Sequence, residues 1–264
     1  MNVSILNTFT EEAFQGNPAA VCLLTEEKAD QWMQQMAKEM NLPVTAFVRM
    51  SGGNVRLRWF TPTTEIPICG HGTLASAYFL WNNQNISKEQ TIHFQTKSGV
   101  LTATLADDSV QLCFPALYEI EIETPAFLVE ALGVNPVYVG KNQFDLLVEV
   151  ESEDIVRNMK PDIGLIEKIP VRGVIVTARS DASGIDFVSR FFSPVQGLNE
   201  DYVTGSAHCC LGPYWQKKMG KHTFTAYQAS ERGGLLNVYV SNDEVRISGK
   251  VTTILEGKLS EHLM

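Results

Sequence analysis

The 264-residue sequence lacks the features that mark membrane-spanning, secreted and nucleic-acid-binding proteins. No stretch approaches the roughly 18 uninterrupted apolar residues that a membrane-spanning helix needs, and Met1 to Phe14 has no basic segment followed by an apolar core. There is no basic run and the net charge is -9, which leaves little to attract a phosphate backbone or an anionic membrane. We therefore expect a cytoplasmic protein whose partner is a small molecule, with neither nucleic acid nor membrane as a partner.

Cysteine is also scarce, and its arrangement argues against a disulfide framework. The five cysteines are an odd number without framework spacing, which is typical of free thiols in a reducing compartment. Hydrophobic residues make up 44% of the chain and charged residues 19%, as in a globular protein. The length suffices for one large domain or two of about 130 residues.

An internal repeat divides the sequence into two similar parts. Residues 58–62, Arg-Trp-Phe-Thr-Pro, recur at 190–194 as Arg-Phe-Phe-Ser-Pro, and residues 98–105 align with 233–240 without gaps. Order and spacing favour a tandem duplication over chance similarity among short strand patterns. We therefore predict an N-terminal half at 1–118 and a C-terminal half at 119–264, with the active-site cleft between them.

Each half is expected to combine many short strands with a few helices. Alternating apolar residues predict the strands, and Thr25 is expected to cap a helix whose apolar stripe ends at Met40. Its partner in the second half is expected to begin at Thr124 and stop near Gly133, and a further helix is expected at 152–159. Two segments are apolar on all sides, which predicts buried helices at 73–81 and 207–215. The predicted fold class is α+β, with two pseudo-symmetric halves, each a curled, barrel-like mixed sheet around a central helix.

A glycine turn precedes each predicted central helix. The turns are Cys69-Gly70-His71-Gly72 and Thr204-Gly205-Ser206, and the second copy has three extra residues before its turn. Backbone N–H groups and the positive end of a helix dipole can receive an anion at such a position. Two turns facing one cleft would hold a carboxylate.

Three motifs in this sequence resemble the phenazine-biosynthesis PhzF-like family over nearly the whole chain. They are Phe-Gln-Gly-Asn-Pro-Ala-Ala-Val at 14–21, the run from Phe60 to His71, and residues 200–207. The resemblance implies a diaminopimelate epimerase-like fold and a cofactor-independent isomerase of a biosynthetic process that moves a proton on carbon. A homodimer is expected only by analogy with that family. The Cys-Gly-His-Gly-Thr motif at 69–73 is also similar to the first catalytic loop of proline racemases.

Two positions depart from these related patterns. The resemblance places an acid/base Glu where this sequence has Val44, which cannot carry a proton. Two-thiol racemases have a second Cys where this sequence has Thr204, whose hydroxyl is too weak an acid to serve as a base unaided. A two-thiol mechanism is therefore disfavoured.

The catalytic candidates are His71, Asp201 and Cys69. His71 and Asp201 match family positions, and Asp201 would act either as a base or by orienting His71. Their structural alternatives are a loop-fixing imidazole and a helix N-terminal or turn carboxylate. Cys69 is either a thiolate base at a helix N-terminus or a small buried residue. Glu65 is a reserve acid/base, with a solvated loop carboxylate as the alternative.

Substrate binding is assigned to backbone N–H groups and small polar side chains. Ser206 matches a family Ser, and the glycines are alternatively needed for tight turns. No metal site is expected, because adjacent soft ligands at 208–210 on a helix point in different directions. The binding candidates are Asn17, Gly70, Gly72, Thr73, Thr204, Gly205 and Ser206.

Two functions remain open on the sequence. The first is a cofactor-independent isomerase or epimerase acting on a small, carboxylate-bearing, amino-acid-like metabolite. The second is a non-catalytic binding or interaction protein that has lost the acid/base at Val44.

Overall fold

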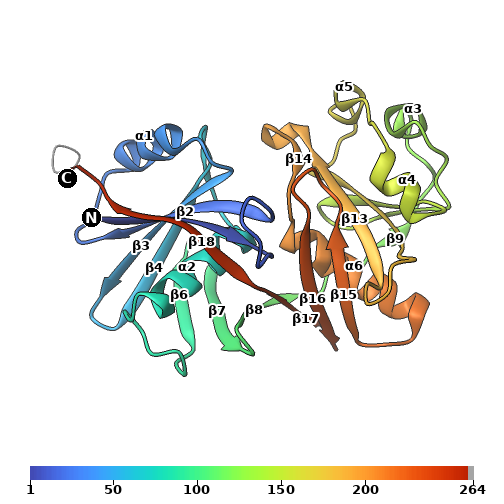
Figure 1. Cartoon of the computed structure of the whole chain (residues 1–264). Coiled ribbons are helices and arrows are strands. Elements are labelled where there is room, and N and C mark those ends of the chain that lie inside the picture. The colour runs from blue at the N-terminus through green and yellow to red at the C-terminus, as the bar shows by residue number, and fades with distance from the viewer. Residues whose placement is uncertain (261–264) are drawn as a thin grey trace. The chain divides into compact units, whose positions relative to one another are not determined.

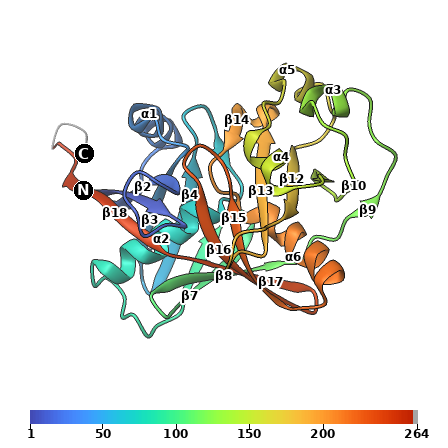
Figure 2. The ribbon, with the colours of Figure 1, turned by 45° about the vertical axis from the view of Figure 1, so that its right-hand side comes forward.

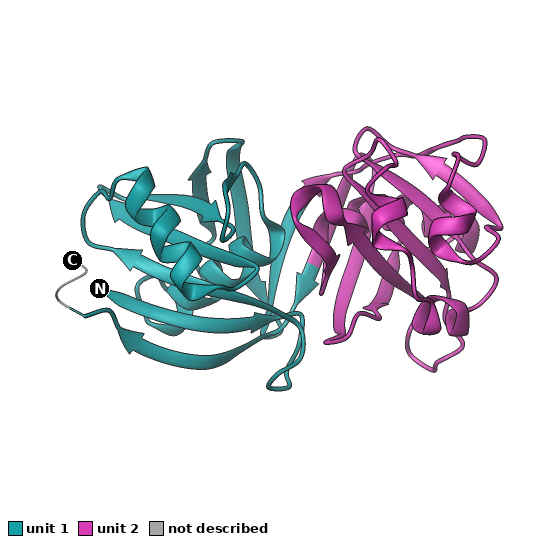
Figure 3. Cartoon of the chain, turned by 90° about the horizontal axis from the view of Figure 1, so that it is seen from above, with its two compact units in different colours: residues 1–113, 248–264 teal, residues 114–247 magenta. Residues whose placement is uncertain are grey.

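The computed structural model describes residues 1–260, and Figure 1 shows the order of its elements. The chain forms two compact units, Met1–Cys113 together with the segment from Ser248 onward, and Phe114–Ile247 (Figure 3). The predicted division at 118/119 placed the C-terminal segment in the second half. This segment instead forms β18, which pairs antiparallel with β1 from Asn2↔Lys258 to Thr8↔Val251 (Figures 1 and 2).

The first unit contains one long mixed sheet, in which β2 runs parallel to β3 and β4 runs parallel to β6. Its elements are β1 (Asn2–Thr8), β2 (Asn17–Leu24), α1 (Asp30–Met40), β3 (Val44–Ser51), β4 (Asn54–Phe60), β5 (Glu65–Ile66), α2 (Gly70–Asn82), β6 (Ile92–Thr96), β7 (Gly99–Ala106), β8 (Ser109–Pro115) and β18 (Val251–Lys258).

The second unit repeats this order. Its elements are β9 (Ile120–Glu121), α3 (Leu128–Leu132), β10 (Tyr138–Lys141), β11 (Asp145–Glu149), α4 (Glu153–Asn158), α5 (Ile163–Ile166), β12 (Gly173–Arg179), β13 (Phe187–Ser193), the 3-10 turn η1 (Pro194–Gln196), β14 (Leu198–Asp201), α6 (Gly205–Met219), β15 (Thr223–Gln228), β16 (Gly234–Ser241) and β17 (Glu244–Gly249).

Strand pairing follows the same pattern in both units. The parallel pairs β11–β12 and β13–β15 correspond to β2–β3 and β4–β6, and the antiparallel pair β12–β13 corresponds to β3–β4. The structure therefore confirms the α+β class and the duplicated, curled mixed sheets that the sequence predicts.

A buried helix occupies the centre of each unit. Both helices begin at the predicted glycine turns, α2 at Gly70 and α6 at Gly205. Their middle residues are almost all buried, which agrees with their lack of a polar face. The helix starts therefore have fixed positions within their own units.

The helix α1 begins four residues later than the sequence predicts. Its N-cap is Ala29, and the stretch from Thr25 is not helical. Glu27 instead forms ion pairs with Arg49 on β3 and Arg56 on β4. The predicted stripe packs as expected, with Met33, Met36 and Ala37 in one buried cluster with residues of β2, β3 and β4.

The helix predicted from Thr124 is not the counterpart of α1 in the second unit. The helix predicted from Thr124 begins only at Leu128, because Phe127 adopts a left-handed conformation with φ of 68°. It ends before Gly133 as predicted. Two helices, α4 and α5, lie in the chain between the parallel strands β11 and β12, as α1 lies between β2 and β3. The N-cap of α4, Ser152, is where the sequence places a helix start.

Within residues 1–260, no helix has both the length and the apolar character needed to cross a membrane.

Candidate active site

The first glycine turn is held by a cysteine cap. Cys69 has extended backbone angles, and its Sγ accepts a hydrogen bond from the Gly72 N–H at 3.4 Å. The Thr73 hydroxyl donates to the Cys69 carbonyl at 2.6 Å. Thr73, predicted to bind substrate, is fully buried and serves here to close the first turn of α2.

The thiol of Cys69 lies beside the imidazole of His71. Its Sγ is 3.5 Å from Nδ1 and 3.9 Å from Nε2 of that ring. Cys69 is 6% exposed and His71 is partly exposed. The sulfur is thus in contact with the imidazole at the N-terminus of α2, where the helix dipole favours negative charge.

The glycine at position 72 is required by packing. A Cβ at Gly72 would lie 2.8 Å from Cδ1 and 3.2 Å from Nε1 of Trp59, whose ring is buried. The Gly72 N–H is also bonded to the Cys69 thiol. Gly72 was predicted to bind substrate, whereas in this structure its N–H belongs to the cap of α2.

The second turn is organised around Thr204 and a buried glutamine. The Thr204 hydroxyl donates to Oδ2 of Asp201 at 2.7 Å, so the carboxylate has a fixed orientation. Gln228, which is fully buried, accepts from the Thr204 N–H at 2.8 Å and donates to the Asp201 carbonyl at 2.8 Å. The sequence interpretation missed Gln228, although its alternation with Phe224 and Ala226 placed a polar residue on the buried face of β15.

Gly205, in contrast to Gly72, is not required by packing. A Cβ there would meet only Cδ1 of Ile247, at an ordinary 3.9 Å. The next residue, Ser206, is partly exposed. Gly205 is itself buried, and the first N–H groups of α6 have no intrahelical acceptor, so they can donate to an anion.

His208 is the counterpart of Thr73, since each lies four residues after the N-cap of its helix. Its Nδ1 is 2.8 Å from the Thr204 carbonyl, which can only accept, so Nδ1 carries the proton. Burial lowers the pKa of His208 to about 4. His208 is therefore neutral near pH 7.

In the part of the chain that the structure describes, no three His, Cys, Asp or Glu side chains are grouped so as to hold a metal ion.

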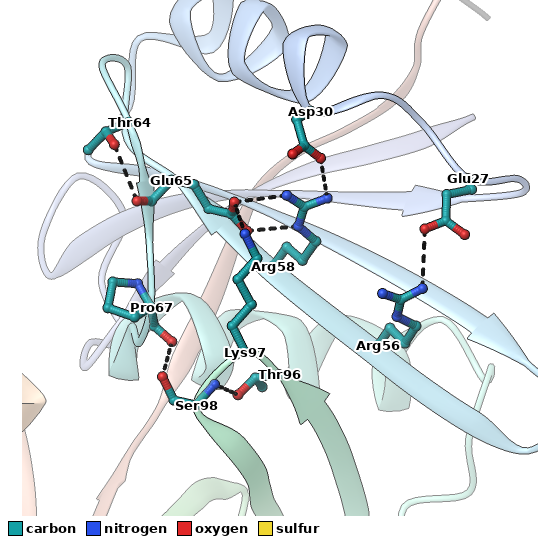
Figure 4. Close-up of polar contacts among 10 residues, drawn as sticks. All are labelled: Glu27, Asp30, Arg56, Arg58, Thr64, Glu65, Pro67, Thr96, Lys97 and Ser98. Carbon is teal, nitrogen blue, oxygen red and sulfur yellow. Dashed lines mark hydrogen bonds and ion pairs between the residues drawn. The ribbon is translucent and has the colours of Figure 1, made fainter.

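Glu65 is neither a solvated loop carboxylate nor a base that is available for catalysis. Its side chain is 18% exposed, and both oxygens accept from the Arg58 guanidinium at 2.8 Å (Figure 4). The hydrogen bonds from Arg58, with those from Lys97, lower the pKa of Glu65 below its usual value. The alternative of a solvated carboxylate is therefore wrong.

Asn17 and Val44 begin neighbouring parallel strands in the first unit, and both are completely buried. The carbonyl of Asn17 accepts from the Thr8 hydroxyl at 3.0 Å. Val44 is paired with Ala19 across the strands. The position to which the family resemblance assigns an acid/base is thus occupied by a fully packed apolar side chain.

The predicted residues form one constellation in each unit. Cys69, His71 and Thr73 lie together at the start of α2, and Asp201 and Thr204 lie together at the start of α6. That both constellations act on one substrate stays a prediction.

Comparison with known proteins identifies the family. The profile described as phenazine biosynthesis-like protein matches residues 6–257. The chain belongs to the phenazine biosynthesis-like family. An uncharacterized isomerase of Halalkalibacterium halodurans is 49% identical over 258 residues, covering 97% of each protein. The resemblance drawn from the three sequence motifs is therefore confirmed.

Solved structures support the same family and its wider fold. A PhzF family crystal structure from Enterococcus faecalis is 39% identical, covers 98% of both chains and has a TM-score of 0.94. A probable proline racemase from Agrobacterium radiobacter K84 covers 98% of this chain and 93% of its own, with a TM-score of 0.65 at 12% identity. That second likeness shows that the two chains share a fold.

Proposed function

We propose that this protein is a cofactor-independent isomerase that moves a proton on carbon in a small, carboxylate-bearing, amino-acid-like metabolite. The observation that carries the proposal is the Cys69 thiol, which caps α2 with His71 Nδ1 only 3.5 Å from its sulfur. Two relatives in other bacteria, at 49% and 43% identity, are named uncharacterized isomerases.

The proposed reaction begins with binding of the carboxylate at the glycine turns. The first N–H groups of an α-helix have no intrahelical acceptor, so the starts of α2 at Gly70 and of α6 at Gly205 offer donors to an anion. The same donors stabilise the enolate-like charge when a proton leaves the carbon next to the carboxylate. Ser206 and Asn17 are proposed to hold further polar groups of the substrate.

His71 and Asp201 are proposed as the groups that exchange the proton. One takes the proton from carbon, and the electron pair of the broken C–H bond moves toward the carboxylate. The other, in its protonated form, returns a proton to carbon, so that no redox step or co-reactant is needed. Cys69 assists by exchanging a proton with the His71 ring, and Thr204 orients Asp201 through its 2.7 Å hydrogen bond.

The working environment follows from the same proposal. We propose a cytoplasmic, homodimeric enzyme of a biosynthetic process, with a small-molecule substrate and with neither nucleic acid nor membrane as a partner. The net charge of -9 supports a partner other than a polyanion.

Solvent exchange tests the proposal directly. Candidate amino acids and ring-containing carboxylates are incubated with the protein in D2O, and deuterium on carbon is measured by mass spectrometry. A prior thermal-shift screen of metabolite extracts narrows the panel, because a true ligand stabilises the native state by mass action. Incorporation into at least one carboxylate is expected, and its absence across a broad panel would overturn the proposal.

The second candidate function is a binding protein that has lost its acid/base. It is favoured by one observation, the completely buried Val44 at the start of β3. Val44→Glu discriminates the two functions. Exchange activity that appears only in this variant would indicate lost chemistry, whereas an active parent would show that another base is at work.

A further inference from the structure

The same ion pair precedes both glycine turns. In the first unit, Arg58 on β4 donates from Nε and Nη2 to the two carboxylate oxygens of Glu65, at 2.8 Å each (Figure 4). In the second unit, Arg190 on β13 donates in the same way to Glu200 on β14, at 2.7 and 2.8 Å. A planar guanidinium that binds a carboxylate with two parallel hydrogen bonds fixes the geometry of both side chains.

Each arginine is further restrained by an aromatic ring two residues along its strand. The Arg58 guanidinium carbon lies 5.2 Å from the centre of the Phe60 ring, and that of Arg190 lies 4.9 Å from the Phe192 ring. The side chains of both arginines are at most 20% exposed. Both ion pairs are therefore partly shielded from solvent.

The spacing between the glutamate and the turn is conserved within the repeat although the loops differ. Glu65 precedes the N-cap Cys69 by four residues, and Glu200 precedes the N-cap Thr204 by four residues. The three extra residues of the second copy lie between Arg190 and Glu200, where the turn η1 forms. The insertion leaves the distance from glutamate to helix start unchanged.

Further contacts hold the segment between Glu65 and Cys69 in the first unit. Lys97 also pairs with Glu65, and the Ser98 hydroxyl donates to the Pro67 carbonyl at 2.7 Å (Figure 4). The backbone is thus held two and four residues before Cys69. His71 follows directly in the first turn of α2.

The second pair is anchored through its arginine. Nη1 of Arg190 donates to the carbonyls of Val156 and Met159 at the end of α4, at 3.3 and 2.8 Å. Its partner Glu200 immediately precedes Asp201, whose carboxylate the Thr204 hydroxyl binds.

We propose that Arg58–Glu65 and Arg190–Glu200 are duplicated positioning pairs, which set the orientation of His71 with Cys69 at one turn and of Asp201 at the other. The catalytic consequence rests on the proposed function, whereas the structural consequence does not. Reacting groups must be held to within about 0.5 Å of their working positions, and a misplacement of about 1 Å can lower a rate by roughly a hundredfold.

Arg58→Lys is the test, because lysine keeps the positive charge but lacks the two parallel N–H donors of the guanidinium. The control is Arg56→Lys on the same strand, since Arg56 makes a single 3.2 Å contact with Glu27, away from the turn. Two-dimensional NMR of the folded variants follows the His71 imidazole titration and the amide signals of residues 69–73. We expect Arg58→Lys to move the titration midpoint by more than about 0.3 pH units and to shift those amides, and Arg56→Lys to leave both unchanged.

A second variant and the exchange assay complete the test. Glu65→Asp keeps the charge but shortens the reach of the carboxylate, and we expect the same NMR changes from it. In the exchange assay, Arg58→Lys and Arg190→Lys are expected to lower kcat at least about tenfold with little change in KM. Lower thermal stability with an unmoved His71 titration and unmoved amide signals would overturn the positioning role. NMR changes in a protein that exchanges no substrate would support the positioning role while contradicting the proposed function.

Discussion

We expect Gly72 and Gly205, which both lie in the first turn of a helix, to respond differently to the same added methyl group. Gly72→Ala places a Cβ 2.8 Å from Cδ1 and 3.2 Å from Nε1 of Trp59, whose ring is 1% exposed. Overpacking of this kind destabilises proteins by about 1–3 kcal/mol. Gly205→Ala places its Cβ 3.9 Å from the nearest side-chain atom, which is ordinary contact.

Comparing the two variants removes the helix-propensity contribution. Alanine is favoured over glycine in a helix by up to about 1 kcal/mol, and both positions lie in the first turn of a helix. This gain is similar at the two sites, so we expect Gly72→Ala to be less stable than Gly205→Ala by about 1–3 kcal/mol.

Urea unfolding measures the difference, and the exchange assay gives the second readout. Gly205→Ala should unfold at or above the wild-type midpoint, yet lose substrate exchange, because on the proposed function its methyl group adds bulk beside the N–H donors at the start of α6. Equal stability of the two variants would refute the steric reasoning. Full exchange activity in Gly205→Ala would refute the assignment of Gly205 to binding.

Three further substitutions probe buried polar interactions, two of them beside the second turn and one elsewhere in the second unit. His208→Gln should remove a pH dependence of the free energy of unfolding. Burial lowers the pKa of His208 from 6.5 to about 4, so the unfolded chain binds a proton that the folded chain does not. Between pH 7 and pH 4, urea unfolding should therefore show the stability of wild type falling by about 3 kcal/mol relative to the variant. A constant difference would contradict the neutral, buried ring. Gln228→Leu should cost about 1–3 kcal/mol, because it leaves the Thr204 N–H without its acceptor, and amide exchange at Thr204 should accelerate; an unchanged exchange rate would argue against the bond. Arg172→Leu should cost about 3–5 kcal/mol, because Asp145 is completely buried and would lose its bidentate partner; a thermal melt close to that of wild type would contradict this expectation.

The duplicated fold was predictable because its signals are local and repeated. The matching Arg-aromatic-Phe segments at 58–60 and 190–192 lie on equivalent strands, and the two all-apolar segments are the central helices. A helix without a polar face has only one stable place, the interior. The α4 start was equally readable, because Ser152 caps its own helix.

The errors arose where tertiary contacts override local preference. The Thr25-Glu26-Glu27 segment has the composition of a helix N-terminus, but Glu27 pairs with arginines on β3 and β4 that are distant in sequence. The role of Glu65 was missed for the same reason. Its partner Arg58 was identified as part of the repeat, but no pattern in one copy showed that the two side chains meet.

The site was only partly predictable. The sequence indicated Cys69 and His71 because they flank a glycine at a helix start, and it indicated His71 and Asp201 because they match positions of the resembled family. It did not indicate Gln228, since the role of that residue depends on β15 ending beside the second turn. Nor could it distinguish Gly72, which packing requires, from Gly205, which packing does not.

The central claim, proton transfer at carbon by His71 and Asp201, is tested most directly by deuterium incorporation from D2O into a carboxylate substrate. Wild type, His71→Ala and Asp201→Asn are compared at one pH, because Asn can still accept the hydrogen bond from Thr204 and keeps the turn intact. We predict incorporation by wild type and a loss of roughly a hundredfold or more in each variant. Equal incorporation rates in all three proteins would contradict the claim.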